Sequence, residues 1–154
     1  MKVLFISSTG GHLNELLQLK KLFSKYEYHI ITENTKSNLE LKKDYKNKIN
    51  YLIYGTNKFI YPFILLLNCS KSVYFYLKIR PQVIITTGTH TAGPMCCIGK
   101  IFGSKIIFIE TYANINTKTK AGKLIYLFSD LFIVQWESML ELYPKAVYGG
   151  WIFE

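Results

Sequence analysis

Two short turns rich in glycine, threonine and histidine hold the residues best suited to chemistry. The first covers residues 7–12, reads S-S-T-G-G-H, and directly follows an apolar run. Paired glycines let the backbone turn tightly, and a helix that begins there brings N–H groups and a partial positive charge to a bound phosphate or sugar hydroxyl. It is neither a dinucleotide fingerprint nor a P-loop, because the third glycine and the Lys-Ser/Thr pair are missing. A plain tight connection is the alternative.

The second turn covers residues 86–94, reads T-T-G-T-H-T-A-G-P, and also follows an apolar run. Small residues and hydroxyls at the carboxyl end of a strand are typical of the ligand crevice in an open α/β sheet. Glu110 follows a third apolar run, residues 105–109, in the same way. A carboxylate there suits hydrogen bonds from sugar hydroxyls or the role of a base. A helix cap or a surface ion pair is the alternative.

Two of the three histidines fall in these turns. His12 directly follows the glycine pair at a predicted helix start, which makes it the better candidate for contact with a reacting hydroxyl or a pyrophosphate. His90 lies in the second turn, whereas His29 alternates within a predicted strand and is interpreted as structural. We predict that His12 and Glu110 are the catalytic residues.

The elements that position these turns are predicted to alternate around a parallel sheet, which gives a Rossmann-like α/β fold with helices on both faces. The expected strands cover residues 2–7, 27–32, 49–53, 82–87, 105–109, 131–135 and 145–148. The first, fourth and fifth are almost entirely hydrophobic, as is typical of central strands. Residues 11–25 predict an amphipathic helix, and the lysine-rich residues 34–48 predict a solvated loop with one exposed helical turn.

The composition predicts one folded domain over residues 1–154, since 49% of the residues are hydrophobic and 16% are aromatic. The net charge of +9 predicts attraction to nucleic acid, a lipid headgroup surface or a phosphorylated ligand. The lysines are scattered and Arg80 is the single arginine, whereas base-reading proteins rely on arginine forks. We therefore expect no specific nucleic-acid partner.

The cysteines Cys69, Cys96 and Cys97 have no spacing that suits zinc. We interpret them as buried, reduced thiols, and we expect neither a metal nor a cofactor. No long apolar stretch of the signal-peptide type precedes the first strand, which predicts a cytoplasmic chain.

The aromatic and aliphatic segment over residues 59–79 is the least ordinary part of the chain. Its apolar core is too short to span a bilayer and contains Pro62. On a helical projection one arc holds Asn68, Lys71, Ser72 and Lys78. The opposite face is apolar and holds Leu65, Leu66, Val73, Tyr76 and Leu77. Such a helix suits a membrane interface, and an ordinary core helix is the alternative. The predicted membrane contacts are Phe59, Ile60, Tyr61, Phe63, Leu66, Lys71 and Lys78.

The motifs together resemble a known family. In order they read S-S-T-G-G-H-L-N-E-L, T-T-G-T-H-T-A-G-P and E-T-Y-A-N, then T-K-A-G-K-L-I-Y-L-F-S-D-L-F-I-V-Q-W and finally Y-G-G-W-I-F. This combination resembles the bacterial relatives of asparagine-linked-glycosylation protein fourteen, which include subunits of capsular and exopolysaccharide glycosyltransferases. The resemblance covers essentially the whole chain, and residues 123–136 are its most specific part.

The resemblance implies the N-terminal, acceptor-binding half of the GT-B fold. A separate catalytic subunit with a UDP-sugar site would complete the enzyme, and the acceptor would be a polyprenyl-diphosphate-linked saccharide. Eukaryotic members carry an N-terminal membrane anchor, whereas this chain begins almost on its first strand. We therefore expect peripheral contact with the inner face of the plasma membrane.

The resemblance also implies roles for the turns. Residues 10–12 look like the acceptor-diphosphate loop, residues 87–91 look like the second glycine-rich loop, and Glu110 matches an acid near the acceptor. The implied acceptor-binding residues are Thr9, Gly10, Gly11, His12, Asn14, Thr87, Gly88, Thr89, His90 and Thr91. Two rival functions stay open, namely a self-sufficient Rossmann-type nucleotide-binding enzyme and a basic nucleic-acid-binding module with salt-sensitive binding.

Overall fold

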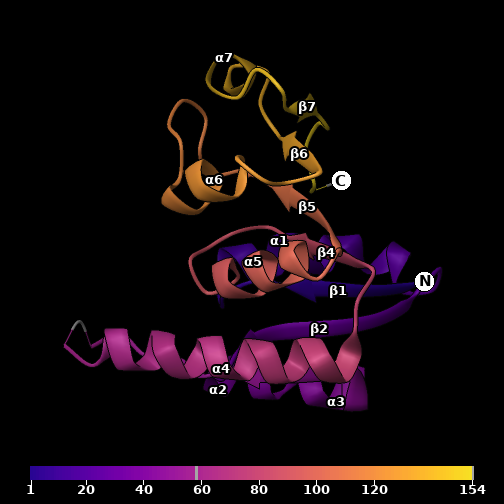
Figure 1. Ribbon diagram of the computed structural model, residues 1–154. Helices are drawn as coiled ribbons and strands as arrows, with labels where there is room; N and C mark the ends of the chain where they lie inside the picture. Colours follow the sequence, from indigo (N-terminus) through magenta and orange to yellow (C-terminus); the bar gives the residue numbers. More distant parts are fainter. Residues whose placement is uncertain (58, 154) are drawn as a thin grey trace.

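Seven parallel strands form one sheet in the order β3-β2-β1-β4-β5-β6-β7 in the computed structural model, which describes residues 1–57 and 59–153 (Figure 1). The strands are β1 (Lys2–Ile6), β2 (Glu27–Glu33), β3 (Ile49–Leu52), β4 (Val83–Thr86), β5 (Lys105–Ile109), β6 (Leu131–Val134) and β7 (Val147–Tyr148). Each lies within two residues of its predicted bounds, so the predicted sheet is confirmed.

The two glycine-rich turns leave the sheet side by side. β1 pairs with β2 on one side, where Phe5 is opposite Ile30, and with β4 on the other, where Phe5 is opposite Ile85. The order in which strands are added therefore reverses between β1 and β4. The carboxyl ends of strands at such a reversal form the usual ligand crevice of an open α/β sheet.

Helices cover both faces of the sheet. They are α1 (Gly11–Gln18), the 3₁₀ helix η1 (Leu19–Leu22), α2 (Lys36–Leu39), α3 (Leu41–Tyr45), the 3₁₀ helix η2 (Lys46–Lys48), α4 (Tyr61–Ile79), α5 (Gly93–Ile101), α6 (Lys120–Ile125) and α7 (Met139–Leu142). Figure 1 shows α4, α5 and α6 on the near face. Side chains alternate along β1, so Ile6 packs with Phe75 of α4 and Met95 of α5, while Phe5 packs with Leu16 of α1 on the other face.

Two local predictions are corrected. The helix expected over residues 11–25 ends at Gln18 and continues as the tighter turn η1, a common way for a helix to end. The loop expected over residues 34–48 contains α2, α3 and η2. Thr35 caps α2 by accepting from the Asn38 N–H, and the buried Asn38 amide donates to the Glu33 carbonyl at 3.0 Å. The segment is anchored by a buried polar residue rather than by apolar ones. Its sequence therefore lacked the apolar spacing that predicts packed helices.

Helix α4 packs with its polar side inward. The side chain of Asn68 is buried at 5% exposure, accepts from the Ile53 N–H at 2.8 Å and donates to the Ile53 carbonyl at 2.9 Å. Ser72 is fully buried, and the Lys71 ammonium donates to the Tyr51 carbonyl at 3.0 Å. Asn68, Lys71 and Ser72 of the predicted polar arc thus face the protein, whereas Lys78 is exposed. This corrects the prediction for Lys71, whose ammonium points to the protein rather than outward.

The opposite side of α4 and the residues just before it are apolar and exposed. We call this surface the outer apolar face; it consists of Phe59, Ile60, Phe63, Leu66, Leu67, Val73, Tyr74 and Leu77. Phe59, Phe63 and Leu66 are 90%, 69% and 66% exposed. Tyr76 was expected on this face, but it is buried and stacks on Phe102. Among the described residues, no helix combines the length and the apolar character that crossing a membrane requires.

Candidate functional site

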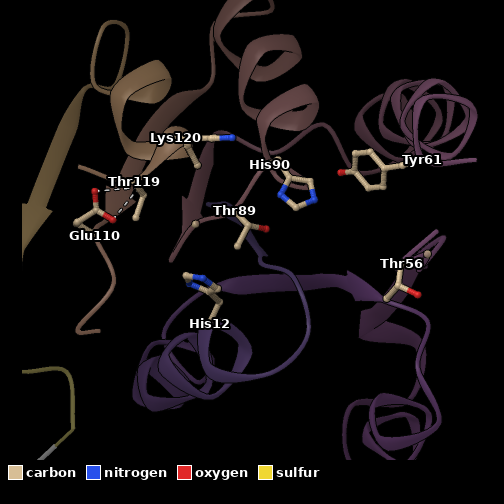
Figure 2. Close-up of a pocket in the computed structure, with 11 residues that line it drawn as sticks. His12, Thr56, Tyr61, Thr89, His90, Glu110, Thr119 and Lys120 are labelled. Carbon is tan, nitrogen blue, oxygen red and sulfur yellow. Dashed lines mark hydrogen bonds between the residues drawn. The ribbon is translucent and has the colours of Figure 1, made fainter. Parts of the chain in front are cut away.

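A pocket of about 590 Å³ opens at the carboxyl edge of the sheet, where the strand order reverses (Figure 2). The connections after β1, β3, β4 and β5 all contribute to it, as does the start of α6. Its lining consists of His12, Gly55, Thr56, Tyr61, Gly88, Thr89, His90, Glu110, Thr119, Lys120 and Ala121. Hydroxyl, imidazole and ammonium groups dominate the polar part of this lining, which suits sugar hydroxyls and phosphate oxygens.

His12 is held in one orientation by the turn after β4. Its Nδ1 lies 2.9 Å from the carbonyl oxygen of Thr87, and the Thr87 hydroxyl donates to the His12 carbonyl at 2.6 Å. A carbonyl oxygen only accepts, so Nδ1 carries the proton in this contact. In the neutral ring Nε2 then keeps its lone pair, which is the arrangement that a general base needs.

The turn after β4 contains strained backbone. Gly88 has a φ of 111°, and a Cβ there would come within 3.4 Å of the His12 ring. Thr89 has a φ of 124°, a region that a β-branched residue rarely adopts. Its Oγ1 is buried and has no hydrogen-bond partner among the described residues. Strained backbone and unpartnered buried hydroxyls are features that often cluster at functional sites.

Glu110 belongs to the pocket lining, although it is only 1% exposed. Its Oε2 accepts from the Tyr143 hydroxyl at 2.9 Å, its Oε1 accepts from the Thr111 N–H at 3.1 Å, and the Thr119 hydroxyl lies 3.0 and 3.1 Å from the two oxygens (Figure 2). Burial raises the pKa of Glu110, although the hydrogen bonds from Tyr143, Thr111 and Thr119 oppose the shift. Each carboxylate oxygen therefore already has protein partners.

Helix α6 begins directly against this carboxylate. Thr119 caps the helix by accepting from the Gly122 N–H at 2.8 Å. A Cβ at Gly122 would collide with the Glu110 carboxylate and the Thr119 hydroxyl, so the close approach requires glycine at this position. The approach places Lys120, the first residue of α6, in the pocket wall (Figure 2).

Glu33 joins the two glycine-rich turns, a role that the sequence analysis missed. It is 8% exposed, accepts from the Thr9 N–H at 3.1 Å and from the Thr91 hydroxyl at 2.7 Å. Its place at the carboxyl end of β2 was the available signal. Glu110 was selected because it follows a strand at the ligand-binding edge of the sheet, and Glu33 does so as well.

Glu15 is a second missed carboxylate. It is 4% exposed on α1 and accepts from the Thr111 hydroxyl at 2.8 Å and from the Tyr112 N–H at 3.2 Å. Burial raises the pKa of Glu15, while these hydrogen bonds and the nearby His12 oppose the shift. A charged residue in an amphipathic helix is normally assigned to the solvent side, so the sequence carried no signal for this contact.

The structure separates the predicted acceptor-binding residues into groups. The main pocket is lined by His12, Gly88, Thr89 and His90. A smaller cavity of about 320 Å³, between α1 and α2, is lined by Thr9, Gly10 and Asn14. Gly11 is exposed at the first residue of α1. Thr87 and Thr91 are buried, and their hydroxyls donate to His12 and Glu33. The two turns therefore share the main pocket through His12 and residues 88–90, whereas Thr87 and Thr91 position other residues.

Other lining residues were missed. Thr56 and Tyr61 come from the connection after β3, and Thr119 and Lys120 come from the start of α6. Tyr61 was assigned to the membrane surface, but its ring packs edge-on against that of His90, with centroids 5.2 Å apart. The signal for Thr56 was its place just after a predicted strand, the same signal that selected the two turns.

The cysteines also differ from their expected burial. All three are free thiols, but only Cys96 is buried, whereas Cys69 and Cys97 are partly exposed. Over residues 1–57 and 59–153, no group of three His, Cys, Asp or Glu side chains could hold a metal ion.

The sequence and the fold both match known proteins. A family model described as "Oligosaccharide biosynthesis protein Alg14 like" matches residues 3–152. The human UDP-N-acetylglucosamine transferase subunit ALG14 is 26% identical over 177 residues, which cover 97% of this chain and 82% of the human protein.

Two solved structures resemble the fold. MurG from Acinetobacter baumannii superimposes with a TM-score of 0.72 at 16% identity, over 89% of this chain and 42% of that one. UDP-N-acetylglucosamine 2-epimerase from Rickettsia bellii superimposes with a TM-score of 0.72 at 16% identity, over 94% of this chain and 41% of that one. The predicted Rossmann-like fold is confirmed. The chain spans about two fifths of the length of these structures.

Proposed function

The chain belongs to the family of Alg14-like oligosaccharide biosynthesis proteins, and on this premise we propose that it is the acceptor-binding subunit of a two-component glycosyltransferase. The acceptor is a saccharide linked to a polyprenyl diphosphate. The sugar comes from a UDP-sugar held by a partner subunit, and the name of the human relative favours UDP-N-acetylglucosamine as that donor. We further propose that the product enters a capsular polysaccharide or exopolysaccharide.

The observation that carries this proposal is the orientation of His12 in an open pocket. The contact with the Thr87 carbonyl leaves Nε2 available, and the pocket wall adds the free hydroxyl of Thr89 and the ammonium of Lys120. These groups suit a sugar with its diphosphate. The name of the human relative, a transferase subunit, supports the division of the enzyme between two chains.

In the proposed reaction His12 acts as the general base. Its Nε2 takes the proton from the acceptor hydroxyl as that oxygen forms a bond to the anomeric carbon of the donor sugar. The bond between the sugar and the diphosphate of UDP breaks, and UDP leaves with the electron pair. The partner subunit stabilises the charge on the leaving group.

We assign Glu110 the role of a positioning residue in this reaction. Its carboxylate is engaged by Tyr143, Thr119 and Thr111, and it is only 1% exposed. It fixes the start of α6 and hence the place of Lys120 in the pocket. The sequence predicted a catalytic role for Glu110 instead. The Glu110→Gln variant distinguishes this role from a positioning role.

We propose that the chain works on the cytoplasmic side of the inner membrane, held there peripherally by the outer apolar face. Phe63 and Leu66 would enter the interface, as the apolar side of an interfacial helix does. The net charge of +9 adds attraction to anionic headgroups. Lys78, on the last turn of α4, is exposed and suits such a headgroup contact.

The test is reconstitution of sugar transfer from two purified chains. The chain and the product of a neighbouring reading frame are mixed with radiolabelled UDP-N-acetylglucosamine and a short-chain prenyl-diphosphate saccharide. We expect transfer only when both chains are present. Full activity of this chain alone, or tight binding of the UDP-sugar by this chain alone, would instead support a self-sufficient nucleotide-binding enzyme.

A further inference from the structure

A groove of about 430 Å³ lies beside the main pocket, on the face of the sheet covered by α4, α5 and α6. Helix α4 contributes Leu65 and Cys69 to its wall, α5 contributes Pro94 and Cys97, and α6 contributes Leu124. These side chains are apolar or weakly polar, in contrast to the hydroxyl and imidazole groups of the main pocket. We call this cavity the prenyl groove.

The prenyl groove and the main pocket are continuous. Tyr61, Thr89, His90 and Lys120 line both cavities. The ion pairs within the described residues use Lys2, Lys100 and Lys105, so the Lys120 ammonium is not engaged in one of them. The buried Thr89 hydroxyl lacks a partner in the same part of the chain. A cation and a free hydroxyl thus lie where the two cavities meet.

We propose that the prenyl groove holds the first isoprene units of the lipid-linked acceptor, while Lys120 and the Thr89 hydroxyl bind its diphosphate at the junction. The three chemical parts of such a molecule, namely sugar, diphosphate and hydrocarbon, then match the order of the main pocket with its hydroxyl and imidazole groups, the cationic junction and the apolar groove. The inference rests on the proposed function, since it assigns the lipid end of the same acceptor.

The outer end of the groove supports an isoprenoid that continues into a membrane. Leu65 in the groove wall adjoins Leu66, which belongs to the outer apolar face and is 66% exposed. On the other wall Leu124 is 52% exposed and is followed by Leu127 at 80%. Exposed apolar side chains therefore follow the groove residues along both α4 and α6.

The first experiment measures affinity along a ligand series by calorimetry on the full chain. The ligands are N-acetylglucosamine diphosphate esters of methanol, geraniol and farnesol, with a short-chain phosphatidic acid as the acyl-lipid arm. We expect the geranyl ester to bind about tenfold more tightly than the methyl ester, because its apolar carbons leave water. We expect the phosphatidic acid to bind more weakly than the geranyl ester.

Matched variants test whether the gain in affinity from the prenyl group comes from the groove. Cys97→Phe fills the groove from α5, and Leu124→Gln makes its α6 wall polar; both should remove the prenyl gain and leave the methyl ester unchanged. Leu39→Gln is the control, because it makes the same change at an exposed leucine of α2 that does not line the groove. It should leave the whole series unchanged.

Thiol protection gives a second readout that does not depend on activity. Cys69 and Cys97 line the groove and are partly exposed, whereas Cys96 is buried. The geranyl ester should slow the alkylation of Cys69 and Cys97 by N-ethylmaleimide severalfold, whereas the methyl ester should not. Mass spectrometry measures the extent of alkylation. Cys96 should stay unmodified throughout, which confirms that the chain remains folded.

The outcomes separate the two proposals. Equal affinity for the methyl and geranyl esters, or an undiminished gain in Cys97→Phe, would refute the prenyl groove and leave the proposed function standing. Equal protection by phosphatidic acid would refute it as well, in favour of an acyl-lipid site. If farnesyl diphosphate protects the cysteines but no saccharide ester binds more tightly than it, the groove stands and the proposed acceptor is wrong.

Discussion

The proposed role of His12 as a general base depends on a contact with the backbone rather than with an acidic side chain. The Thr87 carbonyl fixes the protonated Nδ1, and the glycine at position 88 leaves room for the imidazole ring. The hydroxyl of Thr87 closes the pair by donating to the His12 carbonyl. The result is an imidazole ring held in one orientation in the lining of the pocket.

His12→Ala should lower the turnover of the assembled pair by about 10²–10⁴-fold, the usual contribution of a general base, with a smaller effect on KM. Asn14→Ala is the matched control, because Asn14 lies on the same helix but lines the smaller cavity behind the turn. Steady-state kinetics of both variants with the donor subunit measure the effect. Equal rates for His12→Ala and the unaltered chain would remove the base from this residue.

Glu110→Gln should keep turnover within a few-fold, because the amide oxygen still accepts from the hydroxyls of Tyr143 and Thr119. Glu110→Ala should reduce the free energy of unfolding by about 1–3 kcal/mol, since both hydroxyls lose their acceptor in a buried site. Urea titration and kinetics on the two variants separate the roles. A folded Glu110→Gln chain without activity would restore Glu110 as a catalytic residue.

The unaltered chain and Glu110→Gln should also differ in how their stability depends on pH. The folded-state pKa of Glu110 is raised by burial, so its ionisation destabilises the fold as pH rises from the unfolded value, near 4.5, through the raised value. Glu110→Gln lacks this loss. The stability of the unaltered chain relative to Glu110→Gln should therefore fall as pH increases from 4 to 8.

At the scale of elements, Gly122 lets α6 approach the sheet. Gly122→Ala should destabilise the fold by about 1–3 kcal/mol, because the added methyl group collides with the Glu110 carboxylate and the Thr119 hydroxyl. Glycine to alanine normally stabilises an exposed helix by up to about 1 kcal/mol, so the sign itself is diagnostic. Thermal unfolding measures it, with the exposed Lys123→Ala on the same helix as the control. A stabilised Gly122→Ala chain would show that α6 does not pack this closely.

The turn before β6 depends on Asp130. Burial alone would raise its pKa, but hydrogen bonds from the Ile106 N–H and from Lys100 and Lys105 outweigh this and lower the pKa to about 2. A lowered pKa stabilises the fold above the unfolded value near 3.8 and loses that contribution as pH falls toward 2. Asp130→Asn should therefore cost about 1 kcal/mol at pH 6, after allowance for solvent screening, and only a small fraction of that near pH 2, where half of the Asp130 carboxyl groups in the folded chain are protonated.

Urea denaturation at the two pH values checks this, with Asp44→Asn as the control, because Asp44 is exposed on α3. A cost that persists unchanged at pH 2 would mean that the charge of Asp130 is not the source of the effect.

The strands were predictable because buried parallel strands are continuous hydrophobic runs, and each such run ended at a polar turn. The rotation of α4 was not predictable in the same way. A helical projection shows that Asn68 and Ser72 share one side of the helix, but it does not show which side meets the sheet. That choice depends on Asn68 pairing with the backbone of Ile53, a contact with no signal in the spacing of the residues.

The site was predictable where it lies directly after strands and unpredictable where it depends on packing between distant segments. His12, Gly88 and His90 fall in turns that the sheet brings together. Glu15 contacts Thr111 across 96 positions of the chain, so only the folded structure reveals that its carboxylate is buried.

At the scale of the whole molecule, the outer apolar face predicts a test of membrane attachment. The double variant Phe63→Glu with Leu66→Glu should reduce co-sedimentation with vesicles that contain phosphatidylglycerol by at least about tenfold, because it removes apolar burial and adds repulsion. Leu39→Glu is the control, since Leu39 is an exposed leucine on α2, across the sheet from α4. An equal loss of vesicle binding in both variants would mean that net charge alone, and not the outer apolar face, causes the effect.

The inward-facing polar side of α4 also has a practical consequence for handling the protein. Because Asn68 and Ser72 are fixed against the sheet, the helix cannot roll to hide its leucines and phenylalanines when lipid is withdrawn. In plain buffer the purified chain should therefore self-associate with rising concentration, and a mild detergent should return it to monomers.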